Sequence, residues 1–214
     1  MWQKEYKQKD FYWGLLPNPV LSKFINIIPK GKALDVGAGE GRNSLFLARS
    51  GFEVDAIDKL SEGLKKCEKI AKDNNLLINT QKCDIKDFKF AKEKYSIVLG
   101  INVLDFLKKS EIEAIIKKMK ESLIKEGFIL LSVFSIKDPM YKAIKERKLK
   151  EVEKNTFFLP KYKIYRHFFT KKEIKEILSD FKTIYLKEKR VKDTGHGEPH
   201  FHNIIQLLAK RKRQ

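Results

Sequence analysis

The sequence lacks the features of a membrane, secreted or disulfide-bonded protein. No run of 18 or more apolar residues occurs, so we expect no membrane-spanning helix. Residues 1–14 contain no apolar signal-peptide core, which favours a cytoplasmic protein. The two cysteines, Cys67 and Cys83, show no metal-binding spacing and suit a reducing compartment. A chain of 214 residues is long enough for one well-buried α/β domain, so we expect residues 1–214 to form a single domain.

Arginine is also scarce, although the formal net charge is +18. Seven of the 46 basic residues are Arg, and the excess of Lys is spread along the whole chain. Recognition of phosphates and bases usually favours Arg, and the aromatic residues here are not interleaved with basic ones in a binding motif. We therefore consider a nucleic-acid partner unfavoured, and RNA affinity with a steep salt dependence would argue for it.

The segment from residue 32 to residue 58 predicts a strand, a glycine loop, a helix and a second strand. Apolar residues in 33–36 predict the first strand, and residues 43–50 carry apolar side chains at helical spacing. The second strand, 53–57, ends at Asp58, where a carboxylate can accept both hydrogen bonds of a ribose diol.

The loop between the first strand and the helix has the pattern D-x-G-x-G-x-G, formed by Asp35, Gly37, Gly39 and Gly41. Glycine lets the backbone bend sharply out of a strand and lets a ligand approach closely. The dinucleotide fingerprint is G-x-G-x-x-G, so the spacing here removes the main reason to propose a bound pyrophosphate. The loop suits a ligand with an amine, a ribose and a base.

These motifs resemble motifs I and II of class I S-adenosylmethionine-dependent methyltransferases, and residues 41–58 are similar to the tellurite-resistance (TehB-like) branch. The resemblance implies a Rossmann-like α/β fold with a seven-stranded, mostly parallel sheet, helices on both faces and an antiparallel last strand. It implies S-adenosylmethionine as the cofactor. The residues that we expect around this cofactor are Trp13, Asp35, Gly37, Gly39, Gly41, Arg42, Asp58, Lys59, Asp84, Ile85 and Asn102.

Two of these expectations leave an alternative open. Asp84, after the third strand, would recognise the adenine amino group with Ile85 beside the ring, or it caps a short helix over 86–91. The aromatic residues 11–13, followed by Pro17 and Pro19, form either a flap within residues 1–30 that closes over the cofactor and substrate or plain packing at the edge of the core.

The rest of the chain alternates between strand and helix patterns, which predicts a parallel sheet with helices on both faces. Ser110 and Glu113 form a predicted capping box, as do Thr170 and Glu173. Residues 135–169 interrupt the alternation and predict one helix and an extended piece, either a cover over the substrate side or a basic surface insertion. The predicted helices are 20–28, 61–73, 110–124, 140–148 and 170–178, and the predicted strands after residue 58 are 76–81, one beginning at residue 95, 128–134, 181–188 and 203–209.

The acceptor motifs of DNA base methylases are missing. The fourth strand is followed by Asn102-Val-Leu-Asp105 rather than Asn-Pro-Pro-Tyr or Asp-Pro-Pro-Tyr, and no Pro-Cys nucleophile occurs. We expect Asp105 as a candidate substrate contact and Arg166 as a candidate contact to an anionic acceptor. The candidate bases for a protonated acceptor are His167, His196, His200 and His202.

The histidines at 196, 200 and 202 have three interpretations: exposed or structural, facing the substrate, or metal-binding. We expect no metal site, because carboxylate and cysteine partners at a known spacing are missing. The predicted function is methyl transfer from S-adenosylmethionine to a small molecule, such as a tellurite-like oxyanion or a thiol. The alternatives are an RNA methyltransferase and a non-catalytic protein that binds S-adenosylmethionine.

Overall fold

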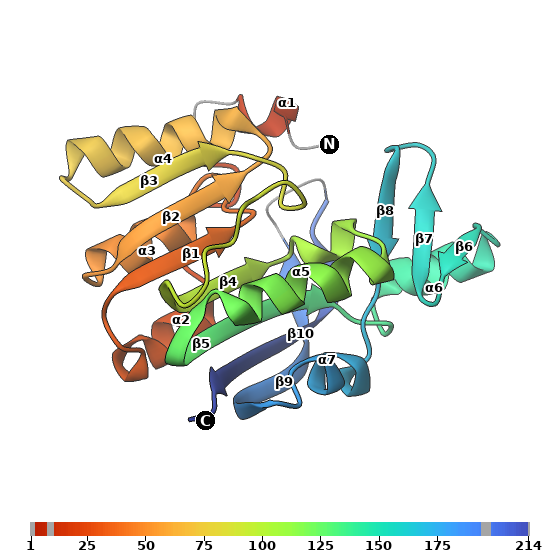
Figure 1. Ribbon diagram of the computed structural model, residues 1–214. Coiled ribbons are helices and arrows are strands. Elements are labelled where there is room, and N and C mark those ends of the chain that lie inside the picture. Colours follow the sequence, from red (N-terminus) through yellow and green to blue (C-terminus); the bar gives the residue numbers. More distant parts are fainter. Residues whose placement is uncertain (1–2, 8–10, 194–197, 214) are drawn as a thin grey trace.

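The computed structural model describes residues 3–7, 11–193 and 198–213 and contains a seven-stranded sheet between two layers of helices (Figure 1). The strand order is β3-β2-β1-β4-β5-β10-β9. β1 to β5 are parallel, whereas β10 pairs antiparallel with both β5 and β9. The seven strands are β1 (Lys32–Val36), β2 (Glu53–Asp58), β3 (Ile78–Lys82), β4 (Tyr95–Ile101), β5 (Leu123–Phe134), β9 (Phe181–Asp193) and β10 (His200–Arg211). The predicted sheet with its antiparallel last strand is confirmed.

Each face of the sheet is covered by amphipathic helices that bury one apolar stripe. α2 (Pro19–Phe24), α3 (Arg42–Arg49) and α4 (Ser61–Asp73) pack on one face, and α5 (Lys109–Glu121) and α7 (Lys171–Ile177) pack on the other. A short 3-10 helix, Ile25–Ile27, extends α2, and a second one, Leu104–Phe106, follows β4. The first helix of the chain, α1, comprises Gln3–Tyr6. None of the helices in the described part of the chain is both long enough and apolar enough to cross a membrane.

One of the two predicted capping boxes forms. Thr170 accepts a hydrogen bond from the Glu173 N–H (3.0 Å), and the Glu173 carboxylate accepts one from the Thr170 N–H (3.4 Å), so α7 starts as predicted. The predicted box at the start of α5 is wrong, because this helix begins at Lys109. The N–H and hydroxyl of Ser110 both donate to Glu153 instead, at 3.0 and 2.9 Å.

The segment after β5 forms a small subdomain that begins with α6 (Pro139–Glu146) and continues as a three-stranded antiparallel sheet. Its strands are β6 (Glu151–Glu153), β7 (Thr156–Leu159) and β8 (Ile164–His167). It packs around its own apolar cluster of Ile144, Phe157, Leu159 and Phe168. In Figure 1 this subdomain projects beyond the side of the main sheet to which the arrowheads of β1 to β4 point. The predicted helix is confirmed, and the predicted extended piece is this sheet.

The structure limits two other predictions, the short helix over 86–91 and the extent of the flap within residues 1–30. Residues 86 and 87 lie in a turn and residues 88–91 have no regular structure, so the predicted short helix over 86–91 is wrong. Residues 20–28 are helical and core-packed, with Val20, Leu21, Ile25 and Ile28 buried. A flap over the cofactor therefore concerns only the residues before α2.

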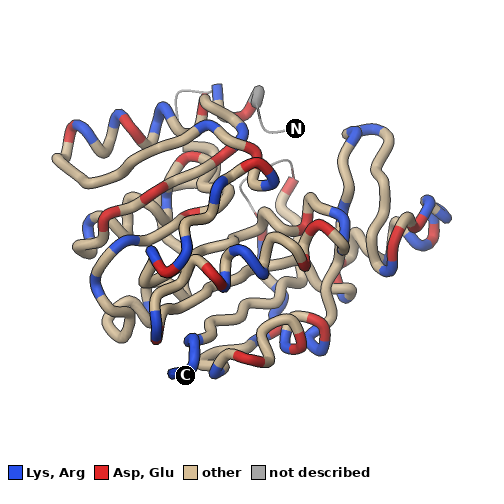
Figure 2. Tube along the Cα trace, viewed as in Figure 1, with Lys and Arg blue, Asp and Glu red and all other residues tan. Residues whose placement is uncertain are grey.

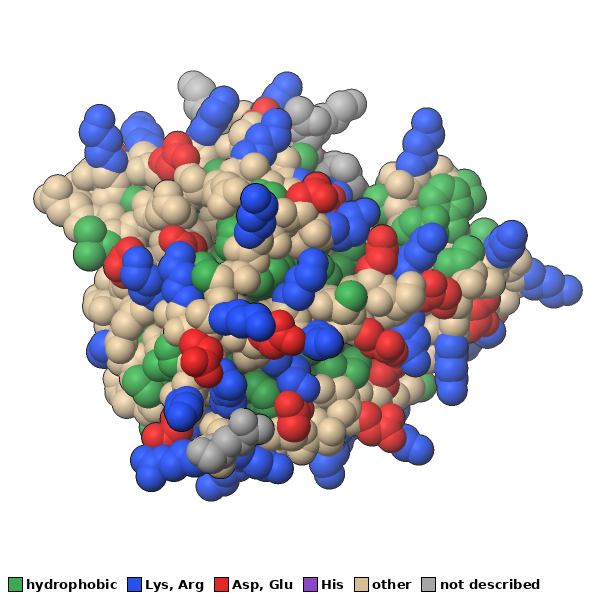
Figure 3. Space-filling model, in the orientation of Figure 1, with side chains coloured by type: hydrophobic (Ala, Val, Ile, Leu, Met, Phe, Trp, Pro, Cys, Tyr) green, Lys and Arg blue, Asp and Glu red, His purple; other side chains and the backbone are tan. Residues whose placement is uncertain are grey.

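Basic side chains are distributed over the molecule rather than gathered on one element. Figure 2 shows Lys and Arg in many separate parts of the chain trace, with Asp and Glu between them. On the face shown in Figure 3, basic side chains alternate with acidic and apolar ones. This distribution agrees with the interpretation of the positive charge as a general surface property.

Candidate functional site

The glycine loop leaves β1 at the carboxyl edge of the sheet and leads into α3. Gly37, Gly39 and Gly41 have φ angles of 71°, 58° and 81°, in the left-handed region that favours glycine. A Cβ on Gly39 would lie 2.8 Å from the hydroxyl oxygen of Tyr6, and a Cβ on Gly37 would lie 2.5 Å from a methyl carbon of Val103. Both the backbone conformation and the close packing around the loop therefore require glycine.

Two carboxylates, the half-buried Asp58 and the buried Asp35, hold this loop and the helix after it in place. Asp58, the last residue of β2, accepts hydrogen bonds from the N–H groups of Gly39 (2.9 Å) and Leu60 (2.8 Å). Burial raises the pKa of the Asp58 carboxyl, and these hydrogen bonds oppose the shift. Asp35 accepts a hydrogen bond from the Ser44 hydroxyl at 2.6 Å, and burial raises its pKa to about 6. Asp58 thus lies at the loop surface, whereas Asp35 lies beneath it and fixes α3.

The N-terminal segment is bonded to the glycine loop. The backbone N–H of Trp13 donates to the Glu40 carboxylate at 3.1 Å, and the backbone carbonyl of Trp13 accepts from the Arg42 guanidinium at 3.5 Å. Glu40 also forms an ion pair with Lys66 of α4 at 2.5 Å. Sequence reasoning missed Glu40 because the glycine pattern specifies no residue type at this position. Its contacts with Trp13 and Lys66 show that it connects the N-terminal segment to α4. The segment around Trp13 is therefore placed where the predicted flap would act.

The carboxyl end of β3 lies beside Asp58. The Cys83 N–H donates to the Asp58 backbone carbonyl at 2.9 Å, which places Asp84 and Ile85 at the same edge as the glycine loop. The Asp84 side chain accepts from the Lys86 N–H at 3.0 Å, so it caps a turn. Ile85 is buried. Asp84 and Ile85 thus lie at the edge where the adenine contacts were predicted, and Asp84 caps a turn rather than the helix of the alternative interpretation.

Asn102 follows β4 in a left-handed conformation with φ 53°, which Asn tolerates better than most residues. Its N–H donates to the Ser132 carbonyl at 2.8 Å, and its side-chain oxygen accepts from the Ser132 hydroxyl at 3.0 Å. Lys59 is exposed, and its charge opposes the raised pKa of Asp58. The structure thus brings the predicted cofactor residues to the ends of β1 to β4.

A buried carboxylate, Asp105, and a buried guanidinium, Arg166, lie near the ends of β4 and β5. Asp105 is fully buried and accepts from the Phe134 N–H at 2.6 Å, and burial raises its pKa to about 6 despite the nearby charge of Arg166. The guanidinium of Arg166, 4% exposed, lies 4.3 and 5.0 Å from the ring centres of Phe106 and Phe134. Within the described residues, Asp105 Oδ2, Arg166 Nε and Arg166 Nη1 have no hydrogen-bond partner.

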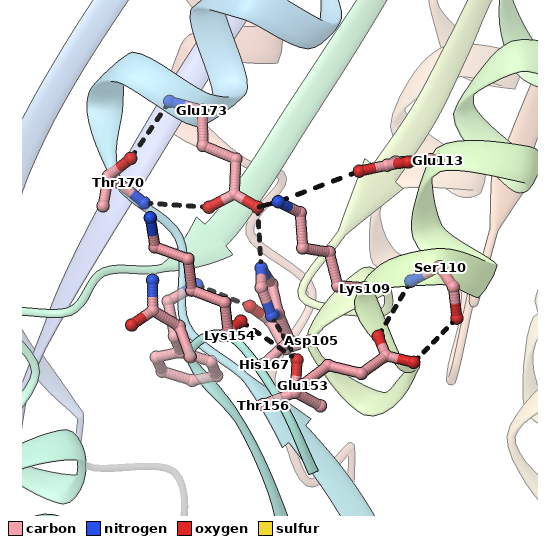
Figure 4. A network of polar contacts seen from close by, with 12 residues as sticks. Asp105, Lys109, Ser110, Glu113, Glu153, Lys154, Thr156, His167, Thr170 and Glu173 are labelled. Atoms are coloured by element: carbon pink, nitrogen blue, oxygen red, sulfur yellow. Dashed lines mark hydrogen bonds and ion pairs between the residues drawn. The ribbon is translucent and has the colours of Figure 1, made fainter. Parts of the chain in front are cut away.

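His167 belongs to a separate polar network between β8 and the starts of α5 and α7 (Figure 4). The residue is fully buried, with Nδ1 2.7 Å from the Thr156 hydroxyl and Nε2 3.2 Å from the Glu173 carboxylate. Glu173 also lies 3.7 Å from the ammonium of Lys109. Because both ring nitrogens contact protein groups, this geometry favours a structural role for His167 over the predicted role as a base.

His200 and His202 lie at the start of β10, on the same edge of the sheet. Their Nε2 atoms are 3.0 Å apart, and His202 Nδ1 is 2.9 Å from the carboxylate of Asp138. His202 Nε2 is also 3.8 Å from the carboxylate of Asp193. Sequence reasoning missed both aspartates, because strand pairing brings Asp193 to His200, and Asp138 lies at the start of α6, 64 residues before His202. His196 lies outside the described residues.

The family model described as tellurite resistance protein TehB matches residues 2–159 of the chain. The chain belongs to the TehB family. A Haemophilus influenzae protein named as a probable S-adenosyl-L-methionine-dependent methyltransferase TehB is 32% identical over 139 residues, which are 62% of this chain and 48% of that protein. The protein of that name from a second H. influenzae strain is 31% identical over 163 residues, 73% of this chain and 56% of that protein. The chain thus spans about half the length of these TehB relatives.

Solved structures agree with the TehB assignment at the level of the fold. The crystal structure of TehB from H. influenzae superposes with a TM-score of 0.71 at 22% identity, over 99% of this chain and 66% of that one. An S-adenosylmethionine-dependent methyltransferase from Methanosarcina mazei gives 0.74 at 20% identity, over 94% of this chain and 100% of that one. The fold is therefore that of class I methyltransferases, and the predicted family and fold are confirmed.

Proposed function

We propose that the chain transfers a methyl group from S-adenosylmethionine to a small protic acceptor, an oxyanion or a thiol. The observation that carries the proposal is the glycine loop bonded to Asp58 at the edge where β1 to β4 end. Ligands of open parallel sheets bind at this edge. A loop of left-handed glycines has no Cβ atoms to keep a ligand away from its backbone, which fits the amino-acid part of the cofactor.

The carboxylates at the same edge fit the rest of this cofactor. Asp58 would hold the ribose hydroxyls, because each of its oxygens accepts one backbone N–H and retains a second lone pair. Asp84 and Ile85 would hold the adenine, and the segment around Trp13 would cover the site. When bound, the cofactor supplies an electrophilic methyl group on a sulfonium. The chain's own contribution is to align the reactants and exclude water.

The buried Asp105 and Arg166 support a protic, anionic acceptor. Arg166 offers donors at Nε and Nη1, and Asp105 offers an acceptor at Oδ2, all three within the described residues and without a protein partner. A hydroxyl-bearing oxyanion would accept from Arg166 and donate its proton to Asp105. With a pKa of about 6, Asp105 is mostly ionised at neutral pH, which suits a general base.

Calorimetric titration with S-adenosylmethionine, S-adenosylhomocysteine and NAD tests the cofactor assignment. We expect micromolar affinity for the first two alone. Asp58→Ala should weaken this binding at least tenfold, or about 1.4 kcal/mol. Asp73→Ala, at an exposed end of α4, is the matched control and should bind normally. If neither ligand binds, or if Asp58→Ala binds as tightly as the wild type, the cofactor assignment is wrong.

The acceptor is tested by the formation of S-adenosylhomocysteine with a panel of tellurite, selenite and small thiols. We expect turnover with at least one member of the panel, and Asp105→Asn and Arg166→Lys should each reduce it. Binding of the cofactor without turnover on any member would favour the non-catalytic alternative. Methyl transfer to total cellular RNA, lost at high salt, would favour the RNA methyltransferase, although the even spread of Lys in Figure 2 provides no specific support for it.

A further inference from the structure

Three side chains of types that can bind metal ions, Asp193, His200 and His202, lie close together where β9 ends and β10 begins. His200 pairs across the two strands with Asp193, and His202 lies two residues further along β10, on the same face of the sheet. One ring nitrogen of each histidine and an oxygen of Asp193 all lie within 4.8 Å of one another. The sequence pattern offers the histidines no carboxylate at a known spacing, but strand pairing provides one.

The hydrogen bonds of Nδ1 in His200 and His202 determine which nitrogen of each imidazole can bind a metal ion. His202 Nδ1 lies 2.9 Å from a carboxylate oxygen of Asp138, and His200 Nδ1 lies 2.8 Å from the backbone carbonyl oxygen of Glu198. Both partners are acceptors, so each Nδ1 carries a hydrogen. In the neutral imidazoles each Nε2 then has a lone pair, and these lone pairs face each other across 3.0 Å. Such an arrangement is stable when a cation lies between the two nitrogens.

The surroundings of His202 resemble the carboxylate–histidine pairs that support metal ligands. Asp138 is 1% exposed and accepts hydrogen bonds from the N–H groups of Met140 (2.8 Å) and Asn203 (2.9 Å) in addition to His202. The ring of Phe134 packs against the imidazole of His202 with centres 4.7 Å apart. These contacts fix the ring of His202 before any ligand arrives.

We propose that Asp193, His200 and His202 bind one divalent transition-metal ion, for which Zn²⁺ is the best match. Two imidazoles and a carboxylate form a ligand set typical of zinc with an open position, whereas Mg²⁺ and Ca²⁺ prefer oxygen ligands alone. Two nitrogens bound to one tetrahedral ion at about 2.0–2.1 Å would be roughly 3.3 Å apart, close to the observed separation.

The site lies beside the proposed methyl-transfer centre but does not depend on it. Phe134 contacts both His202 and the guanidinium of Arg166, so one ring connects the proposed metal site with the candidate acceptor contact. Burial lowers the pKa of Arg42, and the negative charge of Asp193 opposes this shift. Asp193 is therefore close enough to the start of α3 to interact with Arg42 electrostatically. A metal ion here would add positive charge where we propose an anionic acceptor.

Competition with a chromophoric zinc chelator, on the untagged full chain stripped of metal, tests the proposal. We expect one Zn²⁺ per chain with a Kd near or below 1 μM in order of magnitude. Asp193→Asn and His200→Gln should each weaken binding at least about tenfold, and Asp138→Asn should weaken it by about 10- to 100-fold. Asp73→Asn makes the same chemical change at an exposed position and should leave the affinity unchanged.

Equal Zn²⁺ affinity in the wild type, Asp193→Asn and His200→Gln would overturn the proposal and would mean that the two histidines share only a proton. Circular dichroism of every variant separates a lost ligand from a lost fold, and His200→Gln and Asp193→Asn change partly exposed side chains. S-adenosylhomocysteine titration of the same samples distinguishes the two proposals. Normal Zn²⁺ binding without S-adenosylhomocysteine binding would count against the proposed function and leave the metal site standing.

Discussion

Asp105→Asn is expected to change how the stability of the protein depends on pH. In the folded protein burial raises the pKa of Asp105 to about 6, against the opposing charge of Arg166, the N–H of Phe134 and the charge of His167. In the unfolded chain the pKa returns to its ordinary value of 3.8. The folded protein therefore binds a proton that the unfolded chain releases between these two values.

The sign and size of the effect follow from this difference. Stability from this group is complete below the unfolded pKa and is lost as the pH rises toward the folded pKa. Asn resembles the protonated Asp, because its oxygen can still accept from the Phe134 N–H, and it does not titrate. Relative to Asp105→Asn, the wild type should therefore lose about 2 kcal/mol of unfolding free energy between about pH 4.5 and about pH 7.5.

Urea unfolding of both proteins at several pH values within this range measures the difference directly. The comparison cancels the other titrating groups, including Asp35, whose pKa is raised in the same way. Asp73→Asn is the control and should run parallel to the wild type at all pH values, because this residue is exposed. A constant difference between Asp105→Asn and the wild type would show that Asp105 titrates as an ordinary carboxyl, and its proposed role as a base near neutral pH would then be refuted.

Two further predictions concern the glycine loop and α7. Gly39→Ala should weaken S-adenosylhomocysteine binding at least about tenfold in a calorimetric titration, because its Cβ would strain a left-handed residue and press against the hydroxyl of Tyr6. Normal affinity in this variant would mean that the loop does not approach the ligand. Thr170→Ala should lower the unfolding free energy in urea by about 1 kcal/mol, because the Glu173 N–H loses its acceptor, whereas Thr170→Ser should retain most of the stability.

The features that the sequence predicted correctly depend on residues close together in the chain. The strand, glycine loop, helix and strand of residues 32–58 form one continuous unit, and each of its signals acts within a few residues. The same holds for the box that starts α7, where Thr170 and Glu173 are three residues apart. The box predicted for α5 failed because Ser110 bonds to Glu153, a residue 43 positions away.

The candidate site divides along the same line. The positions of the residues proposed to hold the cofactor could be predicted where they follow strand ends that can be recognised in sequence. Glu40 was missed because its partners, Trp13 and Lys66, lie 27 and 26 residues away. Arg166 and His202 contact residues that are more distant in sequence, Phe106 and Asp138, so they were predicted only by residue type and without these partners.

Asp138 combines a local role, of a kind that a sequence pattern can indicate, with a distant role that it cannot. Asp before Pro139 is a typical helix start, and its carboxylate does accept from the Met140 N–H to cap α6. The other oxygen of the same carboxylate bonds His202, 64 residues further along the chain, and so determines which nitrogen of that imidazole carries the hydrogen. Because the cap anchors this carboxylate to α6, the helix that follows β5 and the histidine at the start of β10 are held in one fixed geometry. The subdomain after β5 is thus connected to the chemistry at the edge of the main sheet.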